Sequence, residues 1–182
     1  MHQSAAADDP IAGRTTEEQT FIRKPHLANV YAARLMDLEA GSAFKRRLIL
    51  RLIQRTVDAL ARKDFDALEV TLQTYDPGVE LVIHDGEEIR ESHSGRQGFR
   101  DYWAKLHDEW TDLHFLTKRM LDNGDCWALE MIMRGCDSSD EEVRLVFGCA
   151  YRFSPAGKLT RQDVFFGDEG WRLALEAAGL LE

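Results

Sequence analysis

The hydrophobic pattern of the chain changes its period at Pro77-Gly78, and this change restricts the fold more than any other feature. Upstream, apolar residues recur every three or four positions over 26–40 and 44–63, which predicts two amphipathic helices. A shorter helix is expected around Phe65–Leu72. Pro77-Gly78 itself is typical of a turn, so the helical part of the chain is expected to end there.

Downstream of this turn the pattern is that of β-strands. Runs rich in apolar and β-branched residues alternate between apolar and polar side chains, as they do when a strand buries one face. Pro155-Ala156-Gly157 is expected to join the last two runs as a hairpin. The predicted strands are 79–84, 113–121, 126–134, 143–153 and 159–166.

A helix rich in aromatic residues is predicted between the first two strands. An acidic connector over 85–91 leads to Ser94-Gly95, where this helix is expected to begin. Its bulky side chains recur at helical spacing, which predicts packing against a broad surface such as a sheet. A short helix over 167–181 is expected to close the chain. The aromatic face consists of Phe99, Tyr102, Trp103, Leu106 and Trp110.

Helices followed by a meander of strands predict an α+β fold in which helices cover one face of the sheet. A chain of 182 residues is expected to form one domain with its own core. We expect this domain to cover residues 44–182. Residues 1–43 are expected to form an N-terminal arm and one extra helix, because Pro10, Gly13 and Pro25 interrupt regular structure there.

The net charge of −9 restricts the partners of the chain. An acidic surface repels phosphate backbones and anionic lipids, so neither nucleic acid nor membrane is expected as a partner. No apolar run is long enough to span a bilayer, and the acidic first residues are not expected to be a signal peptide. Cys126, Cys136 and Cys149 form no C-x-x-C pair, which favours reduced thiols and a cytoplasmic protein.

The sequence carries no recognisable cofactor or metal motif. No set of histidines and carboxylates has the spacing of metal ligands, so no metal site is expected. Glycine-rich phosphate loops and a G-x-S-x-G segment are also absent. We therefore expect chemistry, if there is any, to proceed without a cofactor.

Two of the predicted strands each have one strongly apolar face that is partly lined by sulfur. Methionine adapts to irregular shapes, so these faces and the aromatic helix could line a pocket for a small apolar molecule. Ordinary core packing is the alternative for each of these residues. The candidate ligand-binding residues are Trp127, Leu129, Met131, Met133, Phe147, Tyr151, Tyr102 and Trp103.

Asp163 is the candidate general acid or base. In a regular strand Asp163 lies on the same face as Leu159 and Phe165. If these two apolar side chains point into the core, the carboxyl group of Asp163 points there as well. Arg161 lies on the same face and could tune the pKa of this carboxyl. His84 could sit at the rim of a pocket and move protons near neutral pH. The alternative is a purely structural contact between Arg161 and Asp163.

Three segments resemble the SnoaL-like domains of the nuclear transport factor 2-like superfamily. Residues 55–81 are similar to the opening helix pair and first strand of these domains. The segment SGRQGFRDYW, residues 94–103, resembles their aromatic helix. The segment YRFSPAGKLTRQDVFFGDEGWRLALEAAGL, residues 151–180, resembles their closing hairpin and C-terminal helix. The resemblance covers residues 44–182.

The resemblance implies a curved antiparallel or mixed sheet that helices wrap into a cone with a ligand cavity. It also implies frequent homodimers that form through the outer sheet face. Family members include polyketide cyclases, ketosteroid isomerases and limonene-epoxide hydrolases, as well as binding modules. Asp163 aligns with an aspartate of the epoxide hydrolases, but Met131 and Met133 stand where these enzymes need an arginine and a second aspartate.

Two alternative functions are therefore considered. The first is an acid–base isomerase, cyclase or hydratase that acts on an apolar carbonyl compound, with Asp163, Arg161 and His84 as catalytic residues. The second is a non-catalytic ligand-binding or dimerisation module of the same fold. The fold alone does not decide between them, because related folds carry unrelated functions.

Overall fold

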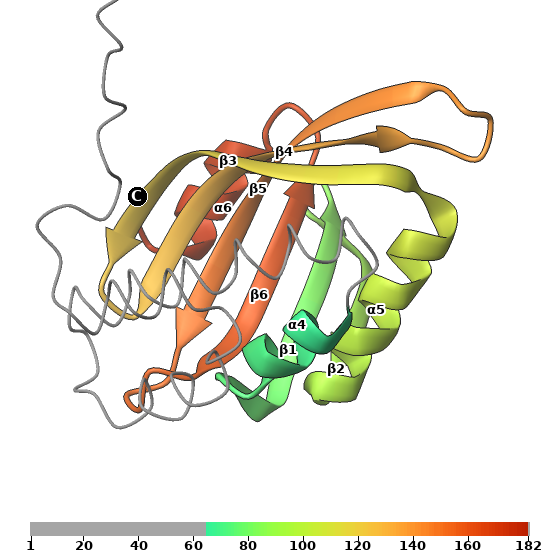
Figure 1. Ribbon diagram of the computed structural model, residues 1–182. Helices are drawn as coiled ribbons and strands as arrows, with labels where there is room; N and C mark the ends of the chain where they lie inside the picture. Colours follow the sequence, from blue (N-terminus) through green and yellow to red (C-terminus); the bar gives the residue numbers. More distant parts are fainter. Residues whose placement is uncertain (1–64, 182) are drawn as a thin grey trace, which may run out of the picture.

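The computed structural model describes residues 65–181, which form a six-stranded sheet with helices on both faces (Figure 1). The helices expected over 26–40 and 44–63 and the expected N-terminal arm lie outside the described residues. The described elements are α4 (Phe65–Leu72), β1 (Tyr75–Asp85), β2 (Glu88–Ser94), α5 (Gly95–Glu109), β3 (Thr111–Asn123), β4 (Cys126–Cys136), β5 (Glu142–Phe153), β6 (Leu159–Phe166) and α6 (Gly170–Ala177).

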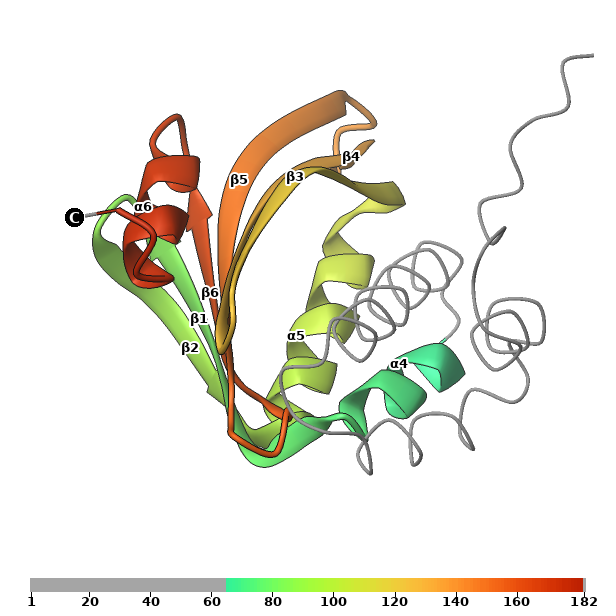
Figure 2. The same ribbon diagram turned by 90° about the vertical axis from the view of Figure 1, so that its left-hand side faces the viewer.

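The sheet is mixed and strongly curved. Its strand order is β2-β1-β6-β5-β4-β3, in which β1 and β6 run parallel and all other neighbours run antiparallel. Figure 2 shows β3, β4 and β5 bending over α5, with α4 and α5 on the concave side and α6 on the convex side. The expected α+β fold with a curved sheet is thus confirmed.

The main core lies on the concave face. Side chains from α4, α5 and five strands meet there, and the largest of them, including Leu68, Phe99 and Trp127, are at most 2% exposed. Burying each such side chain stabilises the fold by roughly 1.5–3 kcal/mol. The apolar spacing of α5 explains its position, because Phe99 and its neighbours one turn apart all face the sheet.

A smaller core joins α6 to the convex face. Ala128 and Ala150 of the sheet pack there against Leu173 and Ala174 of the helix. The start of α6 comes so close to β5 that a Cβ atom at Gly148 would collide with the carbonyl group of Gly170. Small residues therefore set the distance between this helix and the sheet.

Two local predictions were wrong. Pro77-Gly78 does not form a turn but lies inside β1, where the pairing with β6 skips from Tyr75 to Glu80. A proline lacks the amide proton that a regular ladder needs, so the strand bulges there instead of ending. The acidic connector contains a strand, β2, because charged side chains are tolerated on an exposed sheet edge. Gly86, with φ of 62°, forms the tight turn before it.

A second bulge lies at the start of β6. Pairing with β5 passes from Arg152–Arg161 to Phe153–Leu159, which leaves Thr160 as an extra residue. Leu159 belongs to the concave core, whereas Phe165 packs under α6 on the convex face. The expectation that both residues share a face was wrong, because it assumed a regular strand.

Candidate ligand-binding site

A cavity, which we call the inner cavity, lies between the concave sheet face and the helices α4 and α5. Its volume is about 60 Å³, less than the roughly 150 Å³ of an apolar cavity that holds benzene. Much of the concave face is therefore filled by its own side chains. The lining residues are Leu68, Thr71, Tyr75, Tyr102, Trp103, Leu106, Phe115, Met131, Met133, Phe147, Cys149, Tyr151, Gln162, Val164 and Phe166.

The inner cavity continues into a wider opening of about 560 Å³, which we call the mouth. Tyr102, Leu106, Met133 and Phe166 line both spaces. Together the two spaces have the size of a pocket for a small organic molecule. Unlike the inner cavity, the mouth is rimmed by charges of both signs. The charged residues are Arg90, Glu91, Lys105, Glu109, Arg144 and Asp168.

Two tyrosine hydroxyl groups in the inner cavity make no hydrogen bond to the described part of the chain. They belong to Tyr75 of β1 and Tyr102 of α5. Burial raises the pKa of both phenols, and the charges of Glu91 and Glu109 raise the pKa of Tyr102 further. Both groups are therefore neutral at physiological pH and can donate a hydrogen bond to a bound molecule.

A polar cluster forms part of the cavity wall on β5 and β6. Gln162 lies directly opposite Tyr151 in the sheet register. The side chains of both residues line the inner cavity together with Cys149. Burial raises the pKa of Cys149 to about 12, so this thiol is neutral as well. Neutral hydrogen-bonding groups thus interrupt a wall that is otherwise apolar.

Six of the eight predicted ligand-binding residues line the inner cavity: Met131, Met133, Phe147, Tyr151, Tyr102 and Trp103. The other two, Trp127 and Leu129, point to the same side of the sheet but do not line the cavity. They are buried in the concave core, where Trp127 packs on Phe153 at 4.3 Å between ring centroids.

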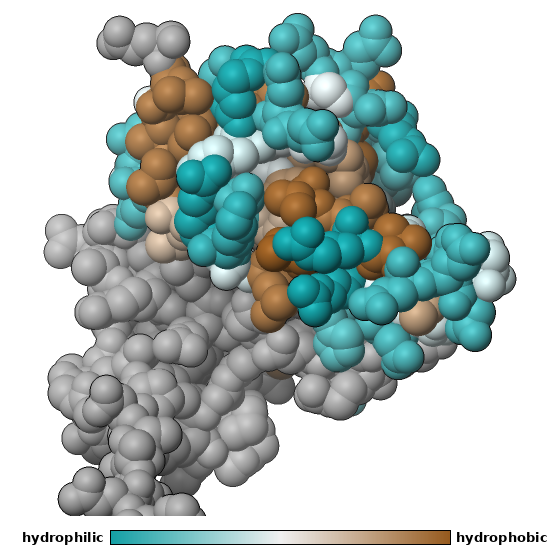
Figure 3. Space-filling model, turned by 90° about the horizontal axis from the view of Figure 1, so that it is seen from above, coloured by the Kyte–Doolittle hydropathy of each residue, from teal (hydrophilic) through white to brown (hydrophobic). Residues whose placement is uncertain are grey.

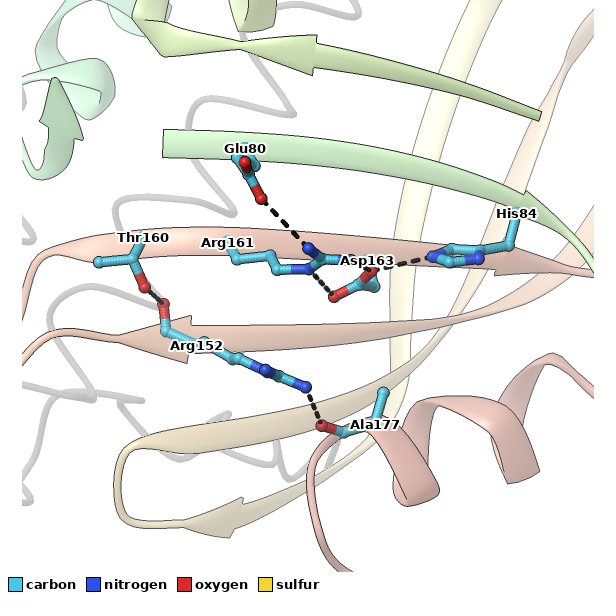
Figure 4. A network of polar contacts seen from close by, with 7 residues as sticks. All are labelled: Glu80, His84, Arg152, Thr160, Arg161, Asp163 and Ala177. Atoms are coloured by element: carbon cyan, nitrogen blue, oxygen red, sulfur yellow. Dashed lines mark hydrogen bonds and ion pairs between the residues drawn. The ribbon is translucent and has the colours of Figure 1, made fainter. Parts of the chain in front are cut away.

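The three predicted catalytic residues come together, but on the other face of the sheet (Figure 4). Asp163 is 3% exposed and lies between Arg161 and His84. Arg161 Nε donates to Asp163 Oδ2 and Nη2 donates to Oδ1, both at 2.8 Å. His84 Nε2 lies 2.9 Å from Asp163 Oδ1, and Arg161 Nη1 donates to Glu80 Oε2 at 3.1 Å.

The location of this network contradicts the expectation that Asp163 faces the ligand cavity. The ring of His84 stacks on Phe165, which packs under α6. Gln162 and Val164, the neighbours of Asp163 in the chain, line the inner cavity instead. Burial by itself raises the pKa of Asp163, but the hydrogen bonds and charges of Arg161 and His84 outweigh it, so the pKa is lowered. This carboxylate therefore stays ionised.

Tyr75 and Gln162 are polar residues of the cavity wall that the sequence pattern did not predict. Tyr75 precedes the predicted first strand, because Pro77-Gly78 predicts a turn between this residue and the strand. Gln162 was assigned to the opposite face by the same counting that placed Asp163 inside. Gln162 could be placed in the cavity only if the bulge at Thr160 were known, and a single sequence gives no clear signal for a bulge.

The described residues contain neither a membrane-spanning helix nor a metal-binding cluster. No helix within residues 65–181 is long and apolar enough to cross a membrane. Among the same residues, no group of three or more histidines, cysteines and carboxylates is arranged to hold a metal ion.

A bent six-stranded sheet that encloses an apolar cavity beneath helices defines the nuclear transport factor 2-like class of α+β fold. Solved structures of low sequence identity share it. A protein with a ketosteroid isomerase-like fold from Catenulispora acidiphila, in complex with trimethylamine, has 13% identity and a TM-score of 0.53. The similarity covers 71% of this chain and 93% of that one.

Two further structures show the same fold. TerC, co-crystallised with polyporic acid, is 17% identical with a TM-score of 0.54, over 70% of this chain and 98% of that one. The epoxide hydrolase/cyclase-like enzyme SalBIII, which has a role in pyran ring formation in the polyether salinomycin, is 13% identical with a TM-score of 0.52. That similarity covers 69% of this chain and 95% of SalBIII.

The family follows from the sequence itself. The family model described as a SnoaL-like domain matches residues 53–162. This range is more than half of the chain, and the protein belongs to the SnoaL-like domain family. None of the curated proteins matches the sequence.

Proposed function

We propose that this protein binds a small, largely apolar molecule that carries a hydrogen-bond acceptor such as a carbonyl oxygen. The supporting observation is that Tyr75 and Tyr102 line a largely apolar cavity, and neither hydroxyl group hydrogen bonds to another described residue. Buried polar groups are normally hydrogen-bonded, so an acceptor on the ligand would complete them.

The shape of the site supports a ligand with two unlike ends. The inner cavity of about 60 Å³ has room for only a few atoms, so the rest of the molecule would extend into the mouth of about 560 Å³. Trp103 and Phe147 would contact its apolar part. The structural relatives that were solved with trimethylamine and with polyporic acid support small organic ligands for this fold.

We favour a binding role over acid–base catalysis. The described lining of the inner cavity includes no carboxylate and no imidazole, the groups that most often act as general acids or bases. Asp163 is engaged by Arg161 on the opposite face. A proton-transfer role for Asp163 would require a ligand site on that face, beside α6.

Ligand-observed NMR tests the proposal with cyclohexanone and methylcyclohexane as probes. We expect cyclohexanone to bind more tightly, and the variants Tyr75→Phe and Tyr102→Phe each to weaken it about three- to tenfold, the value of one hydrogen bond. Glu80→Gln changes an exposed residue on the opposite face and serves as the control. Equal binding of cyclohexanone to the wild type and both tyrosine variants would contradict the proposal, and so would no binding of either probe.

We also propose that the protein forms a homodimer through the convex sheet face. Leu116, Ile132 and Val146 lie side by side on β3, β4 and β5. Leu116 is 53% exposed and Val146 is 36% exposed. Figure 3, which views the molecule from above, shows apolar surface among hydrophilic side chains. A second copy would cover such side chains from water.

Charge complementarity also supports self-association. Arg134 and Arg144 face each other across β4 and β5 beside the apolar row. The turn that joins these strands carries acidic residues between Asp137 and Glu142. The turn of one copy could therefore contact the arginines of another.

Light scattering at micromolar concentration tests the dimer. We expect a dimer that Leu116→Glu converts to a monomer, while Ile89→Glu, at an even more exposed position on β2, leaves it intact. A monomeric wild type would reject the proposal.

A further inference from the structure

We propose that the side chain of Met133 selects ligands by size, because it closes the junction between the inner cavity and the mouth. The inference rests on the proposed binding function and names the residue that decides which molecules enter. Among the described residues, the junction consists of those that line both spaces: Tyr102, Leu106, Met133 and Phe166. Met133 is only 3% exposed, so its side chain lies inside this junction and fills part of it.

The two aromatic members of the junction are held by neighbouring rings. Phe166 packs on Phe147 with 5.3 Å between the ring centroids. Tyr102 packs on His93 at 5.3 Å and meets the edge of Trp103 at 6.3 Å. Rotation of either ring would break these contacts, each of which contributes to stability. Phe166 and Tyr102 therefore form the fixed sides of the junction.

Met133 combines a fixed backbone with a flexible side chain. In the sheet it pairs with Phe115 of β3 on one side and with Leu145 of β5 on the other, so its Cα is held in place. Its side chain is unbranched, has three rotatable bonds and adapts to irregular shapes. Leu106, the remaining member of the junction, is branched and has fewer rotatable bonds. Met133 is thus the part of the junction that moves most easily.

The size of the inner cavity explains why such a movement matters. A volume of about 60 Å³ does not accommodate a ring unless the wall gives way. Met131 faces the same cavity two positions earlier on β4, but it does not line the mouth. A shift of Met131 would only deepen the inner cavity, whereas a shift of Met133 also widens its junction with the mouth. We therefore expect Met133 to admit narrow groups and to hold wide ones in the mouth.

Two cyclic ketones test the inference on the full chain. Cyclohexanone and 2-adamantanone carry the same carbonyl group, but 2-adamantanone is a much wider cage. Met133→Ala removes Cγ, Sδ and Cε from the junction. By isothermal titration calorimetry, we expect this variant to increase the affinity for 2-adamantanone relative to cyclohexanone by about tenfold over the wild type.

Two further methionine variants serve as comparisons. Met131→Ala deepens the inner cavity without opening the junction, so the affinity ratio should rise less than in Met133→Ala. Met120→Ala is the matched control, because Met120 packs against the concave core but lines neither space. This control should keep the wild-type ratio. Circular dichroism checks that all variants are folded.

Methionine methyl NMR tests the wild type without a truncated core side chain. The chain contains five methionines, and the resonance that disappears in Met133→Leu belongs to Met133. We expect cyclohexanone to shift this resonance, because the side chain has to move when the ring enters the junction. The resonance of Met120, identified in the same way, should stay in place.

The outcomes separate this inference from the proposed function. If a folded Met133→Ala variant keeps the wild-type affinity ratio, or if bound cyclohexanone leaves the Met133 resonance unchanged, the inference is overturned while ligand binding stands. An equal rise of the ratio in Met120→Ala would overturn it as well, because general loosening of the core would then explain the effect. If neither ketone binds the wild type or Met133→Ala even at millimolar concentration, the proposed binding function is rejected and the inference with it.

Discussion

Replacing Asp163 with alanine would remove the carboxylate that Arg161 and His84 share on the convex sheet face. Two hydrogen bonds from the guanidinium group and one from the imidazole would be lost. Nε2 of His84 would lose its partner, and the other ring nitrogen, Nδ1, already has none within residues 65–181. Arg161 would keep its contact with Glu80.

The expected cost is large for a single side chain. Breaking a buried ion pair by removing one partner costs about 3–5 kcal/mol. The lower end applies here, since one third of the Arg161 side chain is exposed and the guanidinium can be hydrated. We expect a loss of about 3 kcal/mol, which lowers the Tm of a domain of this size by roughly 6–12 °C.

The same network predicts how stability depends on pH. The pKa of Asp163 in the folded protein is below its value in the unfolded chain, which is about 3.9. Its contribution is therefore fully present above about pH 4 and is lost as the pH falls through the lower, folded pKa. Below that pH the wild type and an Asp163→Asn variant should become more alike in stability.

Urea denaturation at pH 7 and at acidic pH measures both effects. Glu80→Ala serves as the control and should cost at most about 1 kcal/mol, because this carboxylate is exposed. The interpretation would be refuted if Asp163→Ala changed the free energy of unfolding by less than about 0.5 kcal/mol. A stable variant that no longer bound or converted a ligand would restore Asp163 as a catalytic candidate.

Other predictions concern packing and thiol reactivity. Gly148→Ala should push α6 away from the sheet and destabilise the protein by about 1–3 kcal/mol in a denaturation experiment. Gly78→Ala serves as the control and should change the stability little, because a Cβ atom there meets only an ordinary contact. Equal effects of the two substitutions would contradict the close approach of helix and strand. Cys149 is buried and its pKa is raised to about 12, so Ellman's reagent should label it only after unfolding. Partly exposed Cys126 and Cys136 should react first in the folded protein, and rapid labelling of all three thiols would contradict this burial.

The architecture could be predicted from the sequence because it depends on periodicity over long segments. The apolar spacing of α5 and the alternation in β4 and β5 both extend over many residues, so one irregular position does not hide them. For the same reason the cavity residues Met131, Met133 and Phe147 were found: both strands run without a register shift between them.

The candidate site was predicted less well because it depends on single positions. One extra residue at Thr160 inverts the faces of the rest of β6 and exchanges Gln162 for Asp163 in the cavity. The irregular start of β1 likewise hid Tyr75. The contact between His84 and Asp163 joins residues far apart in the chain, and local patterns carry no information about such a pair.

The bulge at Thr160 also affects how this protein can be compared with its relatives. A relative could have an aspartate in the matching alignment column but a final strand without a bulge. Its carboxylate would then face the cavity, whereas in this protein the adjacent Gln162 faces the cavity. Gain or loss of one residue near the last hairpin could thus convert a binder into a catalyst, or the reverse, while every side chain of the strand is retained. Functional divergence by such a shift would leave almost no trace in percent identity.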